Sequence, residues 1–224
     1  FNDYQAIKYF TLHNIMFQTF RFDMISGLSH LNELEVNGGQ LRHVNTHDLL
    51  ASNIIIKKFQ LSNQSNLLST SNLSLIVNNS CRNLKSRAIQ KFCLENAQFK
   101  HLEAESFRCL SGLRELSFFN NQLETIPADA FKNLFNLRLL NLARNFLNFI
   151  AVKAFESLSN LRILRLDNNR IKFIDADTFA PLFRLEVLEL SKNLIESFEN
   201  LSIINQMPNL LTLDLNENRI EKIN

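Results

Sequence analysis

Side chains that could carry out chemistry are sparse in this 224-residue sequence, and they form no catalytic or metal-binding pattern. A zinc or nucleophile site combines histidine, cysteine or acidic residues at characteristic spacings, and the sequence contains neither a C-x-x-C nor an H-E-x-x-H motif. It also lacks a glycine-rich phosphate-binding loop. The five histidines share no ligand spacing, and we expect His43 and His47, four residues apart, to be solvated in a turn. The sequence therefore predicts no catalytic residue, no bound metal and no cofactor.

Carbohydrate attachment is a modification for which the sequence does contain acceptor motifs. The N-x-S motif of N-glycosylation occurs at Asn63, Asn72, Asn78 and Asn200. Because the chain has 30 asparagines, random placement would give a similar number of motifs, so their number does not by itself indicate secretion. We expect at least one of the four to carry a glycan.

Asparagine also recurs at a fixed interval, which reveals an internal repeat. Asn121, Asn145, Asn169 and Asn193 are 24 residues apart, and Asn218 follows after 25. Each lies in the pattern L-x-x-L-x-L-x-x-N-x-L, and five copies of this pattern begin at Leu113, Leu137, Leu161, Leu185 and Leu210. A phenylalanine with the same 24-residue spacing occurs at Phe107, Phe131, Phe155 and Phe179.

The pattern specifies the elements that must position these residues. In L-x-L the two leucines point to one face of a short strand, and the residues beside them point to the other face. One repeat cannot bury its own apolar side chains, but stacked repeats can. The asparagines then face inward, where a polar side chain is tolerated only if it bonds to the backbone of adjacent turns. We therefore expect a structural asparagine ladder, with the phenylalanines lining the convex side of the core.

The N-terminal half keeps the period less strictly. Repeats begin at residues 7, 31, 56 and 89, but Ile15, Gly39, Gln64 and Ala97 take the asparagine position. The repeat after residue 56 begins 33 residues later, and we interpret residues 65–85 as an insertion, with a helix-rich segment as the alternative. The prediction is one solenoid over residues 1–224 with about nine repeats, starting near 7, 31, 56, 89, 113, 137, 161, 185 and 210. Because solenoids need polar caps and none is present, we expect a processed or truncated segment without its terminal caps.

The pattern resembles leucine-rich repeats, and its x-x-x-x-F-x-x-L second half, as in residues 126–134, resembles the typical 24-residue subclass. Such repeats occur in Toll-like receptor ectodomains, secreted arthropod immune proteins, neuronal adhesion proteins and Slit-like guidance factors. The resemblance covers nearly the whole chain and is close for residues 99–224. It implies an α/β fold, a curved horseshoe with a parallel β-sheet on the concave face and loops or short 3-10 or helical turns on the convex face. It also implies an extracellular binding module.

The three cysteines can be placed on this repeat. Cys81 and Cys109 both map to convex segments of adjacent turns and are a candidate disulfide pair, although three unpaired cysteines are an alternative. Cys93 lies between Phe92 and Leu94, so it faces the concave side as a free thiol or an intermolecular link.

The concave face contains the candidate binding residues. Leu139, Ile163 and Val187 share one column across adjacent repeats and form an apolar row on a face that should be wet, with charged residues around it. The alternative is that neighbouring turns half-cover this row. The candidate partner-binding residues are Phe119, Leu139, Ile163, Val187, Arg144, Arg165, Asp167, Glu189 and Lys192.

Composition narrows the function further. The net charge of +2 gives no global attraction to nucleic acid or to a membrane surface, and no apolar run reaches the roughly 18–20 residues of a membrane span. We therefore expect a secreted protein or an ectodomain that binds a protein or microbial ligand, with a dimer or hetero-complex as one arrangement. An innate-immune or pattern-recognition role is the leading hypothesis, and cell adhesion or axon guidance is the alternative. A structural matrix protein that binds fibrous polymers is a third possibility.

Overall fold

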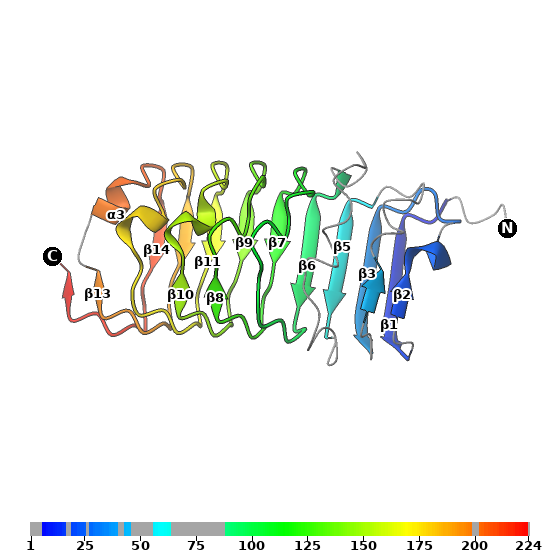
Figure 1. Cartoon of the computed structure of the whole chain (residues 1–224), viewed down its shortest axis with the longest axis horizontal. Coiled ribbons are helices and arrows are strands. Elements are labelled where there is room, and N and C mark those ends of the chain that lie inside the picture. The colour runs from blue at the N-terminus through cyan, green and yellow to red at the C-terminus, as the bar shows by residue number, and fades with distance from the viewer. Residues whose placement is uncertain are drawn as a thin grey trace.

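The chain winds into a solenoid in which each turn adds one strand to a parallel sheet, as the computed structural model shows (Figure 1). The structure describes residues 6–16, 19–25, 27–39, 43–45, 56–63, 88–198 and 202–223. Within these residues the sheet has nine strands, and their order in space is their order in sequence. They are β1 (Tyr9–Ile15), β3 (Glu33–Gly39), β5 (Lys58–Ser62), β6 (Lys91–Glu95), β7 (Glu115–Ser117), β9 (Leu139–Asn141), β11 (Ile163–Arg165), β12 (Val187–Glu189) and β14 (Thr212–Asp214). The expected fold class, a leucine-rich-repeat solenoid with a parallel sheet, is confirmed.

The strands pair in a constant register, because each begins two residues after the first leucine or isoleucine of its repeat. Leu140 in β9 lies opposite Leu116 in β7 and Leu164 in β11, and all three side chains are fully buried. Side chains alternate between the core and the exposed face, as they must along a strand. Equivalent positions of successive repeats therefore form straight columns across the sheet.

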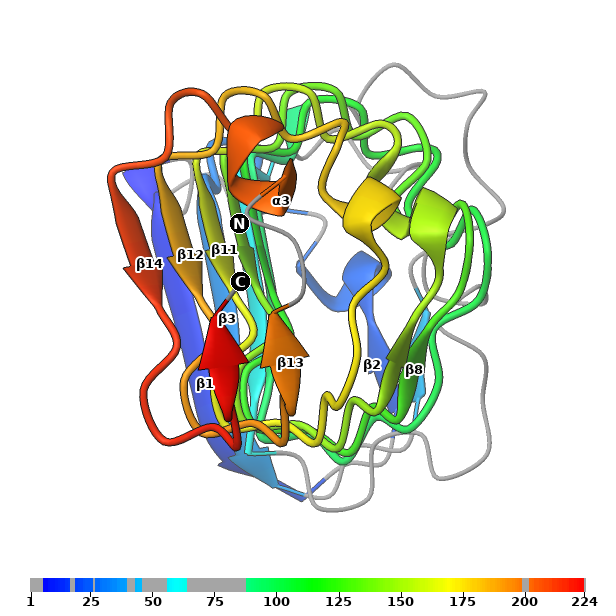
Figure 2. The same ribbon diagram turned by 90° about the vertical axis from the view of Figure 1, so that its left-hand side faces the viewer.

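The second half of each turn returns on the other side of the core through short elements. Looking along the stack, Figure 2 shows the large sheet on one side, with β2, β8 and the 3-10 turns facing it. The short strand pairs are β2 (Thr19–Arg21) with β4 (His43–Asn45), β8 (Thr125–Ile126) with β10 (Phe149–Ile150), and β13 (Ser197–Phe198) with β15 (Lys222–Ile223). The 3-10 turns are η2 (Phe22–Ile25), η4 (Val152–Phe155) and η5 (Ala176–Thr178), and the single α-helical turn in the described segments is α3 (Ser202–Asn205).

A column of phenylalanines fills the side of the core that faces away from the sheet. Phe107, Phe131, Phe155 and Phe179 are each at most 1% exposed. Their rings stack nearly parallel, with centroids 6.1, 6.1 and 6.2 Å apart and interplanar angles of 16°, 11° and 7°. The 24-residue spacing of these residues therefore places each ring directly on the equivalent ring of the next turn.

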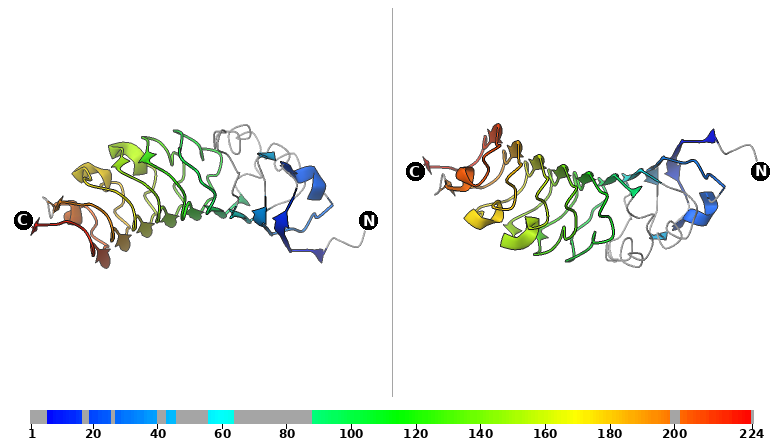
Figure 3. Two further views of the ribbon diagram at one scale, coloured as in Figure 1. Left: turned by 90° about the horizontal axis from the view of Figure 1, so that it is seen from below. Right: turned by 90° about the horizontal axis from the view of Figure 1, so that it is seen from above.

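The stack is elongated, and its strands lie in a single row when seen from below or above (Figure 3). β1 and β14 are at opposite ends of this row. Among the described residues, no helix has the length and apolar character needed to cross a bilayer.

Candidate functional site

Buried asparagines hold the exposed face of the sheet in place. The Nδ2 group of Asn145 donates to the carbonyl oxygens of Leu142 in its own turn, at 3.0 Å, and Phe118 in the preceding turn, at 2.9 Å. Its Oδ1 accepts from the backbone N–H of Leu123 at 3.0 Å. The same three kinds of bond recur one turn at a time at Asn121, Asn169, Asn193 and Asn218. Each asparagine thereby fixes the distance and register between two neighbouring turns.

The backbone turns sharply after each strand through a residue in the left-handed conformation. Its φ lies between 53° and 56° at Asn96, Asn120, Arg144, Asn168, Lys192 and Glu217. The N–H of Asn120 donates to the carbonyl of Ala143 in the next turn at 3.0 Å, and the N–H of Arg144 donates to Asp167 at 3.0 Å. Asparagine tolerates this conformation well, but arginine and lysine do not favour it. Arg144 and Lys192 therefore occupy positions that do not suit their backbone preference.

Leu139, Ile163 and Val187 form the apolar row on the exposed face of the sheet. They pair side by side in β9, β11 and β12, and each side chain is half-buried. Glu115 ends the row on one side and Thr212 ends it on the other. The structure thus places these three residues together and leaves each of them partly accessible.

The charged residues around the apolar row are partly neutralised by one another. Arg165 pairs with Glu189 at 3.1 Å, and Lys192 pairs with Glu217 at 3.5 Å. The guanidinium of Arg144 lies 5.4 Å from the ring centroid of Phe119, within the range of a cation–π contact. Asp167 accepts a hydrogen bond from the side chain of Asn168 at 2.8 Å. All nine residues expected to bind a partner therefore lie on or beside the exposed face, although their charges are less free than the sequence suggests.

Cys93 is a free thiol at a position on this same face, but it is only 4% exposed. Burial, followed by the negative charge of Glu95, raises the pKa of its thiol to about 12. A thiol reacts through its thiolate form. The sulfur of Cys93 is covered by its neighbours and stays protonated at neutral pH, so we expect it to be unreactive. The free thiol and the intermolecular link, the two roles expected from the sequence, remain predictions, and the burial of Cys93 favours the free thiol.

We expect Cys93 to react with iodoacetamide at pH 8 more than about a thousandfold slower in the folded chain than in urea, where its pKa returns to about 8.5. Because the folded-state pKa is raised, the protonated thiol stabilises the fold at pH values below about 8.5, and this contribution is lost as the pH rises toward 12. Peptide mapping of the labelled chain measures the two rates. Equal rates in the folded and unfolded chain would contradict the burial of the thiol.

The remaining modification sites lie mostly outside the described residues. Asn72, Asn78, Asn200 and Cys81 are outside them, as is the expected insertion at 65–85. Asn63 is exposed, and its side chain donates to Asn37 at 2.7 Å. Cys109 is 6% exposed in the returning half of its turn. The glycans and the Cys81–Cys109 pairing remain predictions.

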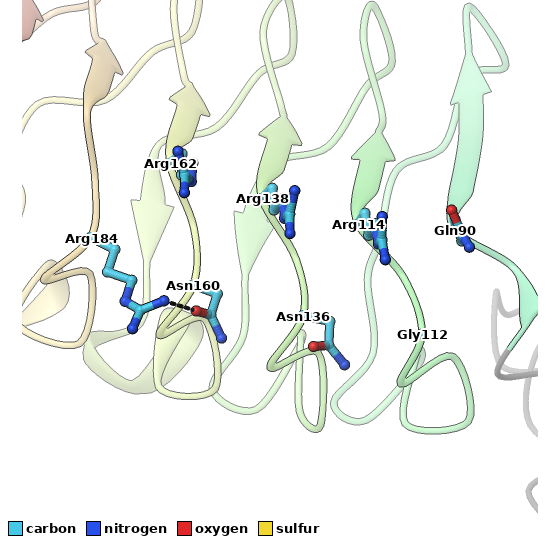
Figure 4. A pocket seen from close by; sticks show the side chains of 8 residues that line it. All are labelled: Gln90, Gly112, Arg114, Asn136, Arg138, Asn160, Arg162 and Arg184. Carbon is cyan, nitrogen blue, oxygen red and sulfur yellow. Dashed lines mark hydrogen bonds between the residues drawn. The ribbon is translucent and has the colours of Figure 1, made fainter.

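A basic groove along the sheet is not among the sites predicted from the sequence, because the candidate residues were taken from positions within and after the strands and not from the position just before each strand. The groove has a volume of about 320 Å³, and its lining residues are Gln90, Gly112, Arg114, Asn136, Arg138, Asn160, Arg162 and Arg184. Figure 4 shows Arg114, Arg138 and Arg162 side by side, each just before the start of its strand. The signal was present in the sequence, since these three arginines are 24 residues apart. No group of three or more potential metal ligands occurs among the described residues.

Comparisons with known proteins support the assignment of the repeat as a leucine-rich repeat. The family model for the leucine-rich repeat matches residues 87–147 and 135–195. An internalin from Listeria monocytogenes has a TM-score of 0.68 and 21% sequence identity, over 94% of this chain and 54% of the internalin chain. A chain in the Toll–Spatzle complex of Drosophila has a TM-score of 0.73 and 22% identity, over 93% of this chain and 31% of that one. This chain thus spans about half the length of the first and a third of the second. No curated protein sequence matches it.

Proposed function

This chain is a leucine-rich-repeat protein, and we propose that it is a non-enzymatic recognition module that binds a protein or microbial ligand with the exposed face of its parallel sheet. The observation that carries the proposal is the apolar row of Leu139, Ile163 and Val187, which is partly accessible and is surrounded by charged side chains. An apolar centre with a polar rim is the usual composition of a protein-binding surface. The similarity to a chain of the Toll–Spatzle complex supports a protein as the partner.

We further propose an extracellular setting and, within it, an innate-immune receptor role. The support is the fold shared with an internalin and with a chain of the Toll–Spatzle complex, a molecular hub in Drosophila development and innate immunity. Non-reducing peptide mass spectrometry of the natively expressed protein tests the compartment. Glycan at Asn63, Asn72, Asn78 or Asn200, together with a Cys81–Cys109 disulfide, is the expected result. Four unmodified asparagines and three free thiols would remove the extracellular assignment.

Replacing Ile163 with glutamate is expected to weaken ligand binding by at least about tenfold, because a charge in the middle of the apolar row must be desolvated on binding. The side chain is half-buried, so we expect the free energy of unfolding to fall by only about 1 kcal/mol. Binding is measured against a panel of secreted proteins, cell-surface ectodomains and microbial surface preparations, and each ligand found is then titrated against the variant.

Thr212→Glu is the matched control, because Thr212 lies in the same column but beyond the end of the apolar row. This variant should bind each ligand as tightly as the original chain does. If Ile163→Glu also retains every ligand at full affinity, the apolar row is not the binding surface and the proposal fails.

A further inference from the structure

Three of the four arginines that line the basic groove, Arg114, Arg138 and Arg162, form a row across the sheet. This row lies one residue before the column that contains the apolar row. All three are exposed. Neighbouring strands of a parallel sheet are about 4.8 Å apart, so the row is roughly 10 Å long. None of the eight residues that line the groove is acidic, and Asn160 contributes a carboxamide oxygen that accepts from Arg184 at 2.7 Å (Figure 4). The groove therefore presents a concentration of hydrogen-bond donors and positive charge.

Two of these arginines form no ion pair in the described part of the chain. Lys58 pairs with Glu33 at 3.4 Å and Lys91 pairs with Glu115 at 2.6 Å, whereas Arg114 and Arg138 make no such pair. Arg162 pairs at 3.1 Å with Glu186, which occupies the same column one strand further on. The Glu186 carboxylate therefore shows how this row can hold an acidic group. The next position along the column is another arginine, and not a carboxylate, for both Arg114 and Arg138.

The surroundings of the row favour a polypeptide as the source of these carboxylates. A second groove, of about 570 Å³, is lined by the same three arginines together with Leu139 and Ile163. Three lysines and three glutamates also line it, and each glutamate is paired with a basic side chain: Glu33 with Lys58, Glu115 with Lys91 and Glu186 with Arg162. An extended peptide places alternate side chains on one side about 6.6–6.8 Å apart, so two acidic side chains can reach the three arginines. Apolar side chains of the same segment would then contact the apolar row, which a sulfated polysaccharide could not do.

We propose that this arginine row binds an acidic segment of a protein partner, in which carboxylates alternate with apolar residues. The proposal rests on the proposed function and specifies its partner chemistry. Arginine matches a carboxylate with two parallel hydrogen bonds, and such charge-assisted pairs are stronger than neutral ones. Binding by this row should also weaken as salt is added, because the arginines are exposed.

Fluorescence anisotropy of the whole chain with three labelled probes tests the proposal. The probes are a decapeptide of alternating glutamate and valine, a decaglutamate peptide and a heparin decasaccharide. We expect the alternating peptide to bind more tightly than either of the others. The double variant Arg114→Gln/Arg138→Gln should weaken its binding about a hundredfold, or about tenfold for each charge-assisted contact. Ile163→Ala, which removes an apolar contact without adding a charge beside Arg162, should weaken the alternating peptide but leave decaglutamate unchanged.

The double variant Arg170→Gln/Arg219→Gln is the matched control, because it removes the same charge from two exposed arginines outside both grooves. The proposal is overturned if both double variants weaken the peptide equally, if the peptide does not bind at low salt, or if the heparin fragment binds at least as tightly through the same arginines. These outcomes are separate from the proposed function. If the panel ligands are lost in Ile163→Glu while the arginine variants bind the peptides normally, the recognition surface stands and the acidic-segment proposal falls.

Discussion

Replacing Phe155 with alanine is expected to lower the free energy of unfolding by about 3–5 kcal/mol. Phe155 is fully buried, and its ring stacks between Phe131 at 6.1 Å and Phe179 at 6.2 Å. The substitution removes the contacts on both sides of the ring and leaves a cavity that two rigid turns cannot close. Equilibrium urea unfolding of the whole chain, followed by circular dichroism, measures the change.

Phe173→Ala is the matched control for this substitution, since the Phe173 side chain, in the next repeat, is 67% exposed. Its effect should be within about 0.5 kcal/mol. If Phe155→Ala is no more destabilising than Phe173→Ala, the phenylalanine column does not hold the turns together.

Asn145→Ala is expected to lower the free energy of unfolding by about 3 kcal/mol in total, because it removes the four hydrogen bonds of this side chain to the backbone of two turns. The backbone groups that lose a hydrogen bond to Asn145 are not affected equally. The carbonyls of Phe118 and Leu142 each keep a bond from another asparagine, Asn121 and Asn169 respectively. The buried N–H of Leu123 keeps no acceptor, so most of the effect should come from this one unpaired donor.

Two further variants help to interpret this result: one changes the hydrogen bonds of Asn145 while keeping its size, and the other is a control at an exposed asparagine. Asn145→Asp retains an acceptor for the Leu123 N–H but cannot donate to the three backbone carbonyls. The exposed Asn148, three residues away, serves as the matched control, and its replacement by alanine should change stability by less than about 0.5 kcal/mol. If Asn145→Ala is as mild as Asn148→Ala, the inward asparagines do not determine the stability of the stack.

The sequence predicted the fold because the same physical requirement recurs in each turn. A leucine at 24-residue spacing must be buried by its neighbours, and the sheet register that pairs Leu116, Leu140 and Leu164 follows from that requirement. The inward position of the asparagines and the stacking of the phenylalanines come from the same argument. Hydrogen-bond distances and ring angles needed the structure, since spacing fixes which turns touch but not how closely.

The candidate site was less predictable, because the exposure of a side chain depends on neighbouring side chains that the 24-residue period does not specify. The alternation of a strand places Cys93 on the open face, yet the side chains around it cover the sulfur almost completely. Arg144 and Lys192 were predicted to surround the apolar row, and the period does not show that Arg144 contacts an aromatic side chain, and Lys192 an acidic one, of an adjacent turn. The arginine row was overlooked because it lies one residue before the strand, where simple alternation predicts an inward side chain.

The repeated asparagine bonds have a consequence for how this molecule could change its length. Each turn presents the same groups at the same places to the turns before and after it. The segments Asn136-Leu137-Arg138 and Asn160-Leu161-Arg162 are identical in sequence, so excision of residues 137–160 would leave the junction unchanged. The N–H of Leu123 would then meet Oδ1 of Asn169 instead of Oδ1 of Asn145. A chain built in this way can lose or duplicate one whole repeat in frame, and each such event would shorten or lengthen its binding face by the width of one strand, about 4.8 Å.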